Sequence, residues 1–307
     1  MELLEKLVTI RAAASDELQL KEFLLAHIEE NQKSWAVQPR IVHGKGFQDC
    51  LILIFGEPTT AIYAHMDSIG FSVGYDKQLI KIGGPRTIDG MQLVGADSQG
   101  EIETELMVIE EEDGHDSYQY VFHREIERGT ILTFKPNFRE TNEYIQSPYM
   151  DNRLGVWNAL QVARDMQNGA IVFGTYEEHG GNTVANCARF LMEEYGVYQA
   201  LISDITWVTS GVVHGGGVAI SMRDSGLPRR SYLNRIIELA KESGVEFQLE
   251  VESTGGSDGG VLQKSSLPID WCFIGAAEDN VHTPDEKVFK KDIQSMVDLY
   301  KFLMKHL

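Results

Sequence analysis

Apolar runs that alternate with amphipathic stretches constrain the fold of this sequence most strongly. CLILIFG (50–56), TTAIYAHMD (59–67), AIVFGTY (170–176) and IDWCFIG (269–275) are typical of strands covered on both faces. Segments with helical spacing lie at 153–169, around 183–195, at 231–244 and at 292–307. Strands that alternate with helices predict an α/β fold with a mixed, mainly parallel sheet flanked by helices.

Several local features refine this prediction. Two amphipathic helices are expected to open the chain within residues 1–30, and Gly169 is expected to end the helix that begins near Arg153. The runs 50–56 and 59–67 are predicted to be adjacent strands joined by a turn at Glu57 and Pro58. Further strands are expected at 199–206, 216–222 and 246–251.

The segment from about residue 70 to 145 has a different pattern. Short alternating stretches such as KQLIKIGG and MQLVGAD are separated by Gly, Asp and Pro, and helical spacing is rare. This pattern indicates a small β-rich domain. We therefore expect a catalytic α/β domain of residues 1–69 plus 146–307 and an inserted β-rich domain of residues 70–145.

Charge and cysteine content exclude several classes of function. The formal net charge of −19 argues against a nucleic-acid partner or an anionic membrane. Cys50, Cys187 and Cys272 are widely separated, which favours buried reduced thiols over disulfides or a thiolate zinc site. The acidic N-terminal stretch does not fit a signal peptide, and the apolar runs are too short to span a membrane, so we expect a cytoplasmic protein. HGGGVAIS (214–221) precedes a strand, which does not fit a dinucleotide-binding or P-loop motif.

Acidic and histidine side chains gather where the predicted strands end. In open α/β sheets, functional groups lie beyond the carboxyl ends of the strands. Each such residue alone has a structural explanation, as a core histidine, a turn or cap aspartate, or a solvated glutamate. Five of these groups, two imidazoles and three carboxylates, form a ligand set for a pair of divalent cations. The candidates are His65, Asp67, Asp151, Glu177, Glu178, His179, Asp204 and His282.

Two spacings have a specific chemical use. If the strand continues, Asp67 lies on the same face as His65 and its carboxylate accepts the second imidazole N–H. Neighbouring side chains of an extended segment point in opposite directions, so Glu177 and Glu178 need not have the same role. One carboxylate can bind a metal while the other moves a proton between the attacking water and the leaving amine.

Six motifs occur in the order known from one enzyme family. AHMD (64–67), MDNRLG (150–155), EEHGG (177–181), SDIT (203–206), GGSDGG (255–260) and VHTPDE (281–286) resemble those of the dinuclear metallo-aminopeptidases of the glutamyl-aminopeptidase-like, tetrahedral-aminopeptidase family. The match runs from about residue 60 to residue 307. The resemblance implies an inserted β-barrel-like domain, removal of N-terminal residues from peptides, and assembly as a large hollow homo-oligomer, often a dodecamer.

The resemblance also implies roles for single residues. It implies that His65 and Asp204 hold one metal ion, Glu178 and His282 hold another, and Asp151 bridges the two. Glu177 corresponds to the general acid and base, and Asp67 to the partner of His65. Zinc or cobalt suits these ligands best, and they also accept manganese. The expected substrate loop contains Gly255, Gly256, Ser257 and Asp258.

Three positions depart from the family pattern, and other functions remain open. Ser68 replaces an acidic residue, Asn152 replaces a frequent second aspartate, and His179 replaces a small apolar residue, with a role as a further ligand or hydrogen-bond donor. A carboxypeptidase or amide deacylase would use the same centre, and a non-catalytic metal-binding scaffold would keep the fold. Three arginines of the loop 209–230 either attract acidic substrate side chains or lie on the surface: Arg223, Arg229 and Arg230.

Overall fold

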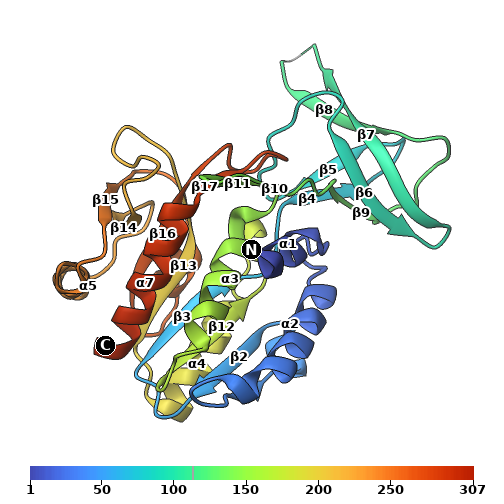
Figure 1. The fold of residues 1–307 in the computed structure, drawn as a ribbon. Coiled ribbons are helices and arrows are strands. Elements are labelled where there is room, and N and C mark those ends of the chain that lie inside the picture. The colour runs from blue at the N-terminus through green and yellow to red at the C-terminus, as the bar shows by residue number, and fades with distance from the viewer. Residues whose placement is uncertain (113) are drawn as a thin grey trace.

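The computed structural model describes residues 1–112 and 114–307; residue 113 of the expected β-rich segment lies outside the described residues. Within them, the strands form one sheet of eleven strands and a second sheet of six. Figure 1 shows the large sheet with its helices as one body and the smaller sheet projecting beside it. This arrangement is the predicted α/β fold with an additional β-rich part.

The large sheet is mixed, and its centre is parallel. Its order is β1-β2-β12-β3-β13-β16-β17-β11-β10, with β14 paired to β16 and to β15. The strands β12, β3, β13 and β16 run parallel to one another, and those around them add antiparallel pairs. The strands of this sheet are β1 (Arg40–Val42), β2 (Leu51–Phe55), β3 (Thr60–His65), β10 (Arg139–Glu140), β11 (Tyr144–Gln146), β12 (Gly169–Gly174), β13 (Gln199–Trp207), β14 (Val218–Arg223), β15 (Phe247–Val251), β16 (Asp270–Asp279) and β17 (Lys287–Phe289).

Two local predictions are wrong. The strands β2 and β3 are not neighbours, because β12 lies between them, antiparallel to β2 and parallel to β3. Both runs are buried throughout and accept a partner on either edge, so their closeness in sequence does not decide the pairing. The helix after the β-rich segment ends at Ala163, and Gly169 begins β12 with a φ of +141°, which favours glycine.

Helices cover both faces of the large sheet. One apolar core contains side chains of α1, α2, α3, α5 and α7, and a second core on the other face contains those of α4 and α6. Burial on both faces explains why the central strands are apolar throughout. The helices are α1 (Glu2–Thr9), α2 (Leu18–Asn31), α3 (Met150–Ala163), α4 (Thr183–Tyr195), α5 (Arg230–Ser243), α6 (Asp258–Lys264) and α7 (Lys290–His306).

The smaller sheet is antiparallel and has the order β5-β4-β9-β6-β7-β8. Its core is formed by side chains such as Phe71, Leu93 and Phe134. A bridge between Gln78 and Gln119 links the β5 edge to β8, so the sheet nearly closes into a barrel. Its strands are β4 (Gly70–Val73), β5 (Leu79–Ile82), β6 (Gln92–Asp97), β7 (Gly100–Glu110), β8 (Asp116–Val121) and β9 (Ile131–Phe134).

The division into two domains at residues 69/70 and 145/146 stays a prediction. The six strands of the small sheet lie between Gly70 and Phe134, whereas β10 and β11 pair within the large sheet. Cys50, Cys187 and Cys272 are buried free thiols, as predicted. Across the described part of the chain, every helix is too short or too polar to cross a membrane.

Candidate active site

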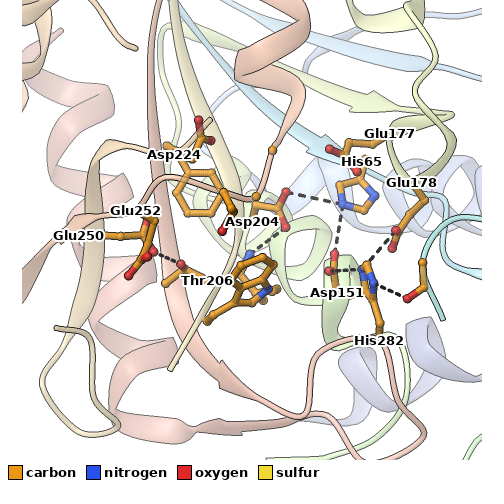
Figure 2. A pocket seen from close by; sticks show the side chains of 17 residues that line it. His65, Asp151, Glu177, Glu178, Asp204, Thr206, Asp224, Glu250, Glu252 and His282 are labelled. Atoms are coloured by element: carbon orange, nitrogen blue, oxygen red, sulfur yellow. Dashed lines mark hydrogen bonds and ion pairs between the residues drawn. The ribbon is translucent and has the colours of Figure 1, made fainter. Parts of the chain in front are cut away.

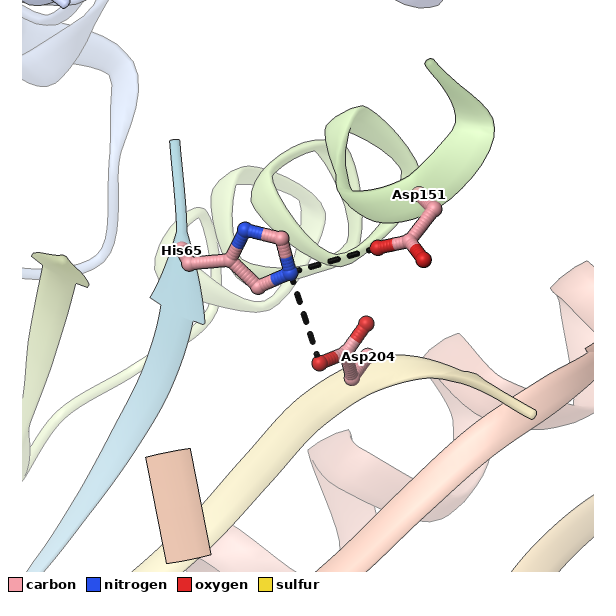
Figure 3. Close-up of side chains that lie close together, drawn as sticks. All are labelled: His65, Asp151 and Asp204. Atoms are coloured by element: carbon pink, nitrogen blue, oxygen red, sulfur yellow. Dashed lines mark ion pairs between the residues drawn. The ribbon is translucent and has the colours of Figure 1, made fainter. Parts of the chain in front are cut away.

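The site lies at the carboxyl edge of the parallel strands. His65 is the last residue of β3, and Asp204 lies in the neighbouring strand β13. Tyr63 pairs with Ile202, so His65 and Asp204 lie two residues further on along their strands and share a face. His65 Nε2 is 3.6 Å from Asp204 Oδ2 (Figure 3). The register of two buried strands thus brings the first two candidates together.

Asp151 lies between the two histidines. It is the second residue of α3, and its non-helical dihedral angles (φ −77°, ψ 105°) kink the start of the helix. Its Oδ1 is 3.2 Å from His65 Nε2, and its Oδ2 is 3.3 Å from His282 Nε2. The two oxygens of one carboxylate therefore face two different imidazoles.

The second imidazole and a glutamate complete the cluster. His282 lies in the connection between β16 and β17, and Glu178 lies in the short 3₁₀ turn Glu177–His179 that follows β12. His282 Nε2 is 3.2 Å from Glu178 Oε2 (Figure 2). Within residues 1–112 and 114–307, two groups of side chains thus offer ligand atoms within 4.8 Å of one another, and Asp151 belongs to both: His65, Asp151 and Asp204, and Asp151, Glu178 and His282.

Backbone carbonyls orient both imidazoles. His65 Nδ1 is 3.1 Å from the carbonyl oxygen of Asp67, and His282 Nδ1 is 3.0 Å from that of Gly84. A carbonyl oxygen only accepts hydrogen bonds, so each Nδ1 carries a proton and, in the neutral ring, each Nε2 presents a lone pair to the site. This is the tautomer that a metal ligand requires.

Asp67 has a different set of contacts from the expected one. The strand ends at His65, and the Asp67 carboxylate is 3.6 Å from His65 Nδ1, farther than the backbone carbonyl. The carboxylate accepts hydrogen bonds from the backbone N–H groups of Glu177 (3.1 Å) and Glu178 (3.0 Å). Asp67 therefore fixes the turn that carries both glutamates as well as lying beside His65.

The charges of the cluster are tightly coupled. Burial raises the pKa of Glu178 to about 7, and the nearby Asp151 carboxylate adds to this effect. Burial opposes the charged form of His282, but Asp151 and Glu178 outweigh it and raise the pKa of His282 to about 11. Glu178 Oε1 is buried without a hydrogen-bond partner among the described residues. Crowded carboxylates with an unused oxygen fit a site for divalent cations.

Two further groups titrate abnormally. Burial raises the pKa of Glu177 well above its ordinary value, and the charge of His65 only partly opposes this. Burial also opposes a charged His65, yet Asp204, Asp151 and Asp67 hold its pKa well above the ordinary value. Perturbed groups that share a cavity are typical of functional sites.

The three departures from the family pattern have structural explanations. Asn152 donates its Nδ2–H to the carbonyl of Ser203 (2.9 Å), a bond that an aspartate could not make. The hydroxyl of Ser68 donates to the carbonyl of Ala12 (3.2 Å). His179 Nδ1 accepts the backbone N–H of Gly83 (3.1 Å), and His179 belongs to neither ligand group in the described chain.

Two residues of the site have no role in the sequence-based prediction. Glu286 accepts the backbone N–H groups of Asp151 (3.2 Å) and His282 (2.9 Å). The buried Arg153 donates to the carbonyls of Leu7 and Met66, which attaches α1 to the segment after β3. Both residues lie inside the motifs VHTPDE and MDNRLG, where the other charged residues include proposed metal ligands. A charged residue without a role in such a motif was the signal that could have identified them.

A cavity of about 280 Å³ adjoins the cluster. Gly255 and Gly256 of the expected substrate loop line it, but Ser257 and Asp258 do not. Ser257 caps α6 through its Oγ, which accepts the N–H of Gly259 at 3.2 Å, and Asp258 is buried. The other lining residues are His65, Gly84, Asp151, Glu177, Glu178, Asp204, Ile205, Thr206, Trp207, Asp224, Glu250, Glu252, Thr254, Phe273 and His282.

The acids and histidines surround a cavity at the carboxyl edge of a parallel-centred α/β sheet, which is where open α/β sheets bind their ligands. The family model described as M42 glutamyl aminopeptidase matches residues 90–299, more than half of the chain. The chain therefore belongs to the M42 glutamyl aminopeptidase family, a family of peptidases.

Individual relatives agree with this assignment. A curated Acetivibrio thermocellus protein described as "Putative aminopeptidase" is 26% identical over 182 residues, which cover 56% of this chain and 54% of that protein. The chain thus spans about half the length of the curated relative it matches.

Solved structures show the same fold at low sequence identity. The TET aminopeptidase of a marine sediment archaeon of the Thaumarchaeota has a TM-score of 0.85 at 17% identity, covering 100% of this chain and 96% of that one. The TET1 peptidase of Pyrococcus horikoshii has a TM-score of 0.79 at 21% identity, covering 98% of each chain. These similarities establish the mixed α/β fold.

Proposed function

We propose that this protein is an aminopeptidase that uses two divalent metal ions to remove N-terminal residues from peptides. The observation that carries the proposal is the position of Asp151, whose two carboxylate oxygens face His65 and His282 separately. Such a carboxylate suits a bridging ligand between two cations. Membership of the M42 family supports peptide substrates.

The residues divide into two ligand sets with one shared member. His65 and Asp204 would hold one ion, Glu178 and His282 the other, and Asp151 both. The unpartnered Oε1 of Glu178 supports this assignment, because a buried carboxylate oxygen without a donor is stabilised by a cation. Imidazole and carboxylate ligands suit zinc or cobalt, and also manganese. When bound, such ions supply Lewis-acid polarisation of the peptide carbonyl and lower the pKa of water.

Glu177 is the proposed general base and acid. Its side chain lines the cavity and belongs to neither ligand group of the described residues. The Glu177 carboxylate takes one proton from the attacking water and returns it to the amine nitrogen as the C–N bond breaks. The Asp67 carboxylate holds the Glu177 backbone and thereby positions this group at the cavity wall.

We also infer that the protein assembles as a homo-oligomer, with a dodecamer as the expected form, and acts in the cytoplasm. One structurally similar protein forms a dodecamer, and the P. horikoshii TET1 peptidase assembles into a tetrahedron or an octahedral shell. Light scattering coupled to size-exclusion chromatography measures the mass of the assembly. A monomer of 34.4 kDa in solution would contradict the inference.

Removal and replacement of the metal tests the proposed activity. The protein is treated with a chelator, dialysed, and assayed with aminoacyl-anilides and N-blocked peptides after addition of zinc, cobalt or manganese. We expect loss of hydrolysis on chelation and recovery with at least one ion. Release of C-terminal residues would identify a carboxypeptidase, cleavage of N-acyl groups a deacylase, and metal binding without any hydrolysis a scaffold.

A further inference from the structure

Three carboxylates lie across the cavity from the metal-ligand groups. Asp224 follows β14, Glu250 lies in β15, and Glu252 follows β15. Figure 2 shows all three on the side of the cavity opposite His65 and His282. Among the described residues, none of the three belongs to a group that could hold a metal ion. The cavity therefore has a second acidic wall that the metal centre does not explain.

Glu250 is the most informative member of this wall. It is only 4% exposed, and the Thr206 hydroxyl donates to one of its oxygens. In the described chain no lysine or arginine forms an ion pair with Glu250, Asp224 or Glu252. A buried carboxylate that faces a cavity without a cationic partner has a desolvation cost that a cationic ligand would offset.

Three apolar side chains also line the same cavity. Trp207, Phe273 and Ile205 line it together with the carboxylates. Phe273 and Ile205 are buried residues of the large sheet, so their side chains have fixed positions. Aromatic and aliphatic walls with a carboxylate at one end match a side chain that has a long alkyl stem and a terminal cation.

The arginines of the loop 209–230 do not neutralise the negative charge of the acidic wall. Arg223 donates its Nε–H to the backbone carbonyl of Asp224 (3.1 Å), and Arg229 pairs with Asp270. Arg223, Arg229 and Arg230 are absent from the cavity lining. The described lining contains two histidines of the ligand groups and no lysine or arginine. An acidic substrate side chain would meet only like charges on this wall.

We propose that Asp224, Glu250 and Glu252 form a specificity pocket for the cationic side chain of an N-terminal lysine or arginine. This inference rests on the proposed aminopeptidase function and adds the substrate class to it. The substrate's first carbonyl lies at the metal-ligand groups, its alkyl stem passes Trp207 and Phe273, and its terminal cation meets the acidic wall. Burial raises the pKa of both Asp224 and Glu250, and an ammonium or guanidinium group beside them favours their ionised forms.

The test compares two substrates that differ in one charged group. Lysyl and norleucyl p-nitroanilides have the same alkyl stem, and only lysine carries the ε-ammonium. We expect kcat/KM to be higher for the lysyl substrate by about tenfold or more, the range of a charge-assisted hydrogen bond. Glu250→Gln keeps an acceptor for Thr206 but removes the charge, and we expect it to reduce the lysyl to norleucyl ratio by about tenfold.

Two variants control for overall charge and for folding. Glu242→Gln removes one negative charge from the exposed surface of α5 and is expected to leave the ratio unchanged. Glu252→Gln changes a half-buried residue of the same wall, so it tests the pocket if Glu250→Gln does not fold. If Glu250→Gln or Glu252→Gln lowered kcat/KM equally for the lysyl and the norleucyl substrate, the wall would bind the α-amino group instead. This result would overturn the proposal.

A binding measurement separates this proposal from the proposed function. Calorimetric titration with free L-lysine and L-norleucine reports on the pocket even if the protein cleaves neither anilide. Tighter binding of lysine, weakened in Glu250→Gln and unchanged in Glu242→Gln, supports the pocket without reference to catalysis. Hydrolysis of both anilides at similar rates, or equal binding of the two amino acids, would contradict the pocket and leave the aminopeptidase proposal standing.

Discussion

The Asp67 carboxylate accepts a hydrogen bond from the backbone N–H of Glu177 at 3.1 Å, and its second oxygen accepts the N–H of the next residue at 3.0 Å. One side chain beside His65 thus also fixes the peptide segment that carries the proposed base and a proposed ligand. The strand β3 and the turn after β12 are joined at this point, so the positions of both halves of the site depend on one carboxylate.

Asp67→Asn should separate this positioning role from metal binding. An asparagine offers one acceptor oxygen, and its NH₂ group faces the second backbone N–H. We expect kcat to fall by about 10–100-fold, the usual effect of losing a group that orients metal ligands. Steady-state kinetics and metal analysis on the same sample provide the measurement. An unchanged kcat with full metal content would show that the two backbone hydrogen bonds do not position the base.

Glu177→Gln and Glu178→Gln form a matched pair of adjacent substitutions. The first should keep bound metal but lower kcat by about 10²–10⁴-fold, because the proton acceptor is lost. The second should lower the metal content, because Glu178 Oε2 faces His282 in one ligand group. Elemental analysis and kcat are measured for both proteins. If Glu177→Gln lost the metal and Glu178→Gln retained it, the two roles would be assigned the wrong way round.

Glu17 should make folding stability depend on pH near neutrality. Burial, and then the charge of Asp67, raise the pKa of Glu17 to about 7 from an ordinary value of 4.5. Between these values the folded protein binds more protons than the unfolded chain, so the free energy of unfolding falls as pH rises from about 4.5 to about 7. Glu17 Oε1 accepts the N–H groups of Ser15 (3.0 Å) and Tyr176 (3.3 Å), and glutamine retains that oxygen.

The Glu17→Gln variant isolates this contribution. Relative to the parent protein, it should gain stability as pH rises through this range and show the larger advantage at pH 8. Denaturant unfolding of both proteins at pH 5 and pH 8 gives the difference directly. A difference in unfolding free energy that is the same at both pH values would mean that Glu17 does not titrate between them.

Gly155→Ala should disturb both ligand groups through packing. A methyl group on Gly155 would overlap the carbonyl oxygen of Ser203 and the side chain of Asn152. Asp151 precedes Asn152 and Asp204 follows Ser203, so both proposed ligands should shift. We expect about 1–3 kcal/mol of destabilisation from overpacking and a lower metal affinity. Thermal unfolding and metal titration are the measurements.

Gly260→Ala is the control for that substitution. Gly260 lies in α6, and a methyl group there meets no heavy atom within 4 Å. The change should be neutral or stabilise the protein by up to about 1 kcal/mol through helix propensity. Equal effects of the two substitutions would contradict the close packing of α3 against β13.

The sequence predicts which segments form strands of the large sheet better than it predicts which strands pair with each other. Fully buried strands such as β2 and β3 are recognisable from apolar runs, because each needs cover on both faces. Their pairing is not recognisable, since β12, more than a hundred residues away in sequence, separates them. The sequence does not predict the short α6 and β17, because a seven-residue helix or a three-residue strand has too few residues to show a period.

The site is also predicted only in part, because the residues that gather there are predictable and their backbone contacts are not. The rule that functional groups lie at the carboxyl ends of parallel strands brings His65, Asp204 and Glu178 together without any knowledge of the pairing. Contacts made by backbone atoms are invisible in a sequence, so Asp67 is predicted as a partner of His65 but not as an acceptor for two N–H groups. The acidic wall is also missed, because Glu250 lies in an alternating strand where a glutamate normally faces solvent.

An aminopeptidase hydrolyses the first peptide bond beside a free N-terminus, and one comparison of two peptides tests this activity directly. One peptide with a free α-amino group and the same peptide N-acetylated are incubated with the metal-loaded protein, and the products are identified by mass spectrometry. We predict stepwise loss of N-terminal residues from the free peptide and none from the acetylated one. Cleavage of the acetylated peptide at an equal rate, or release of residues from the C-terminus, would contradict it.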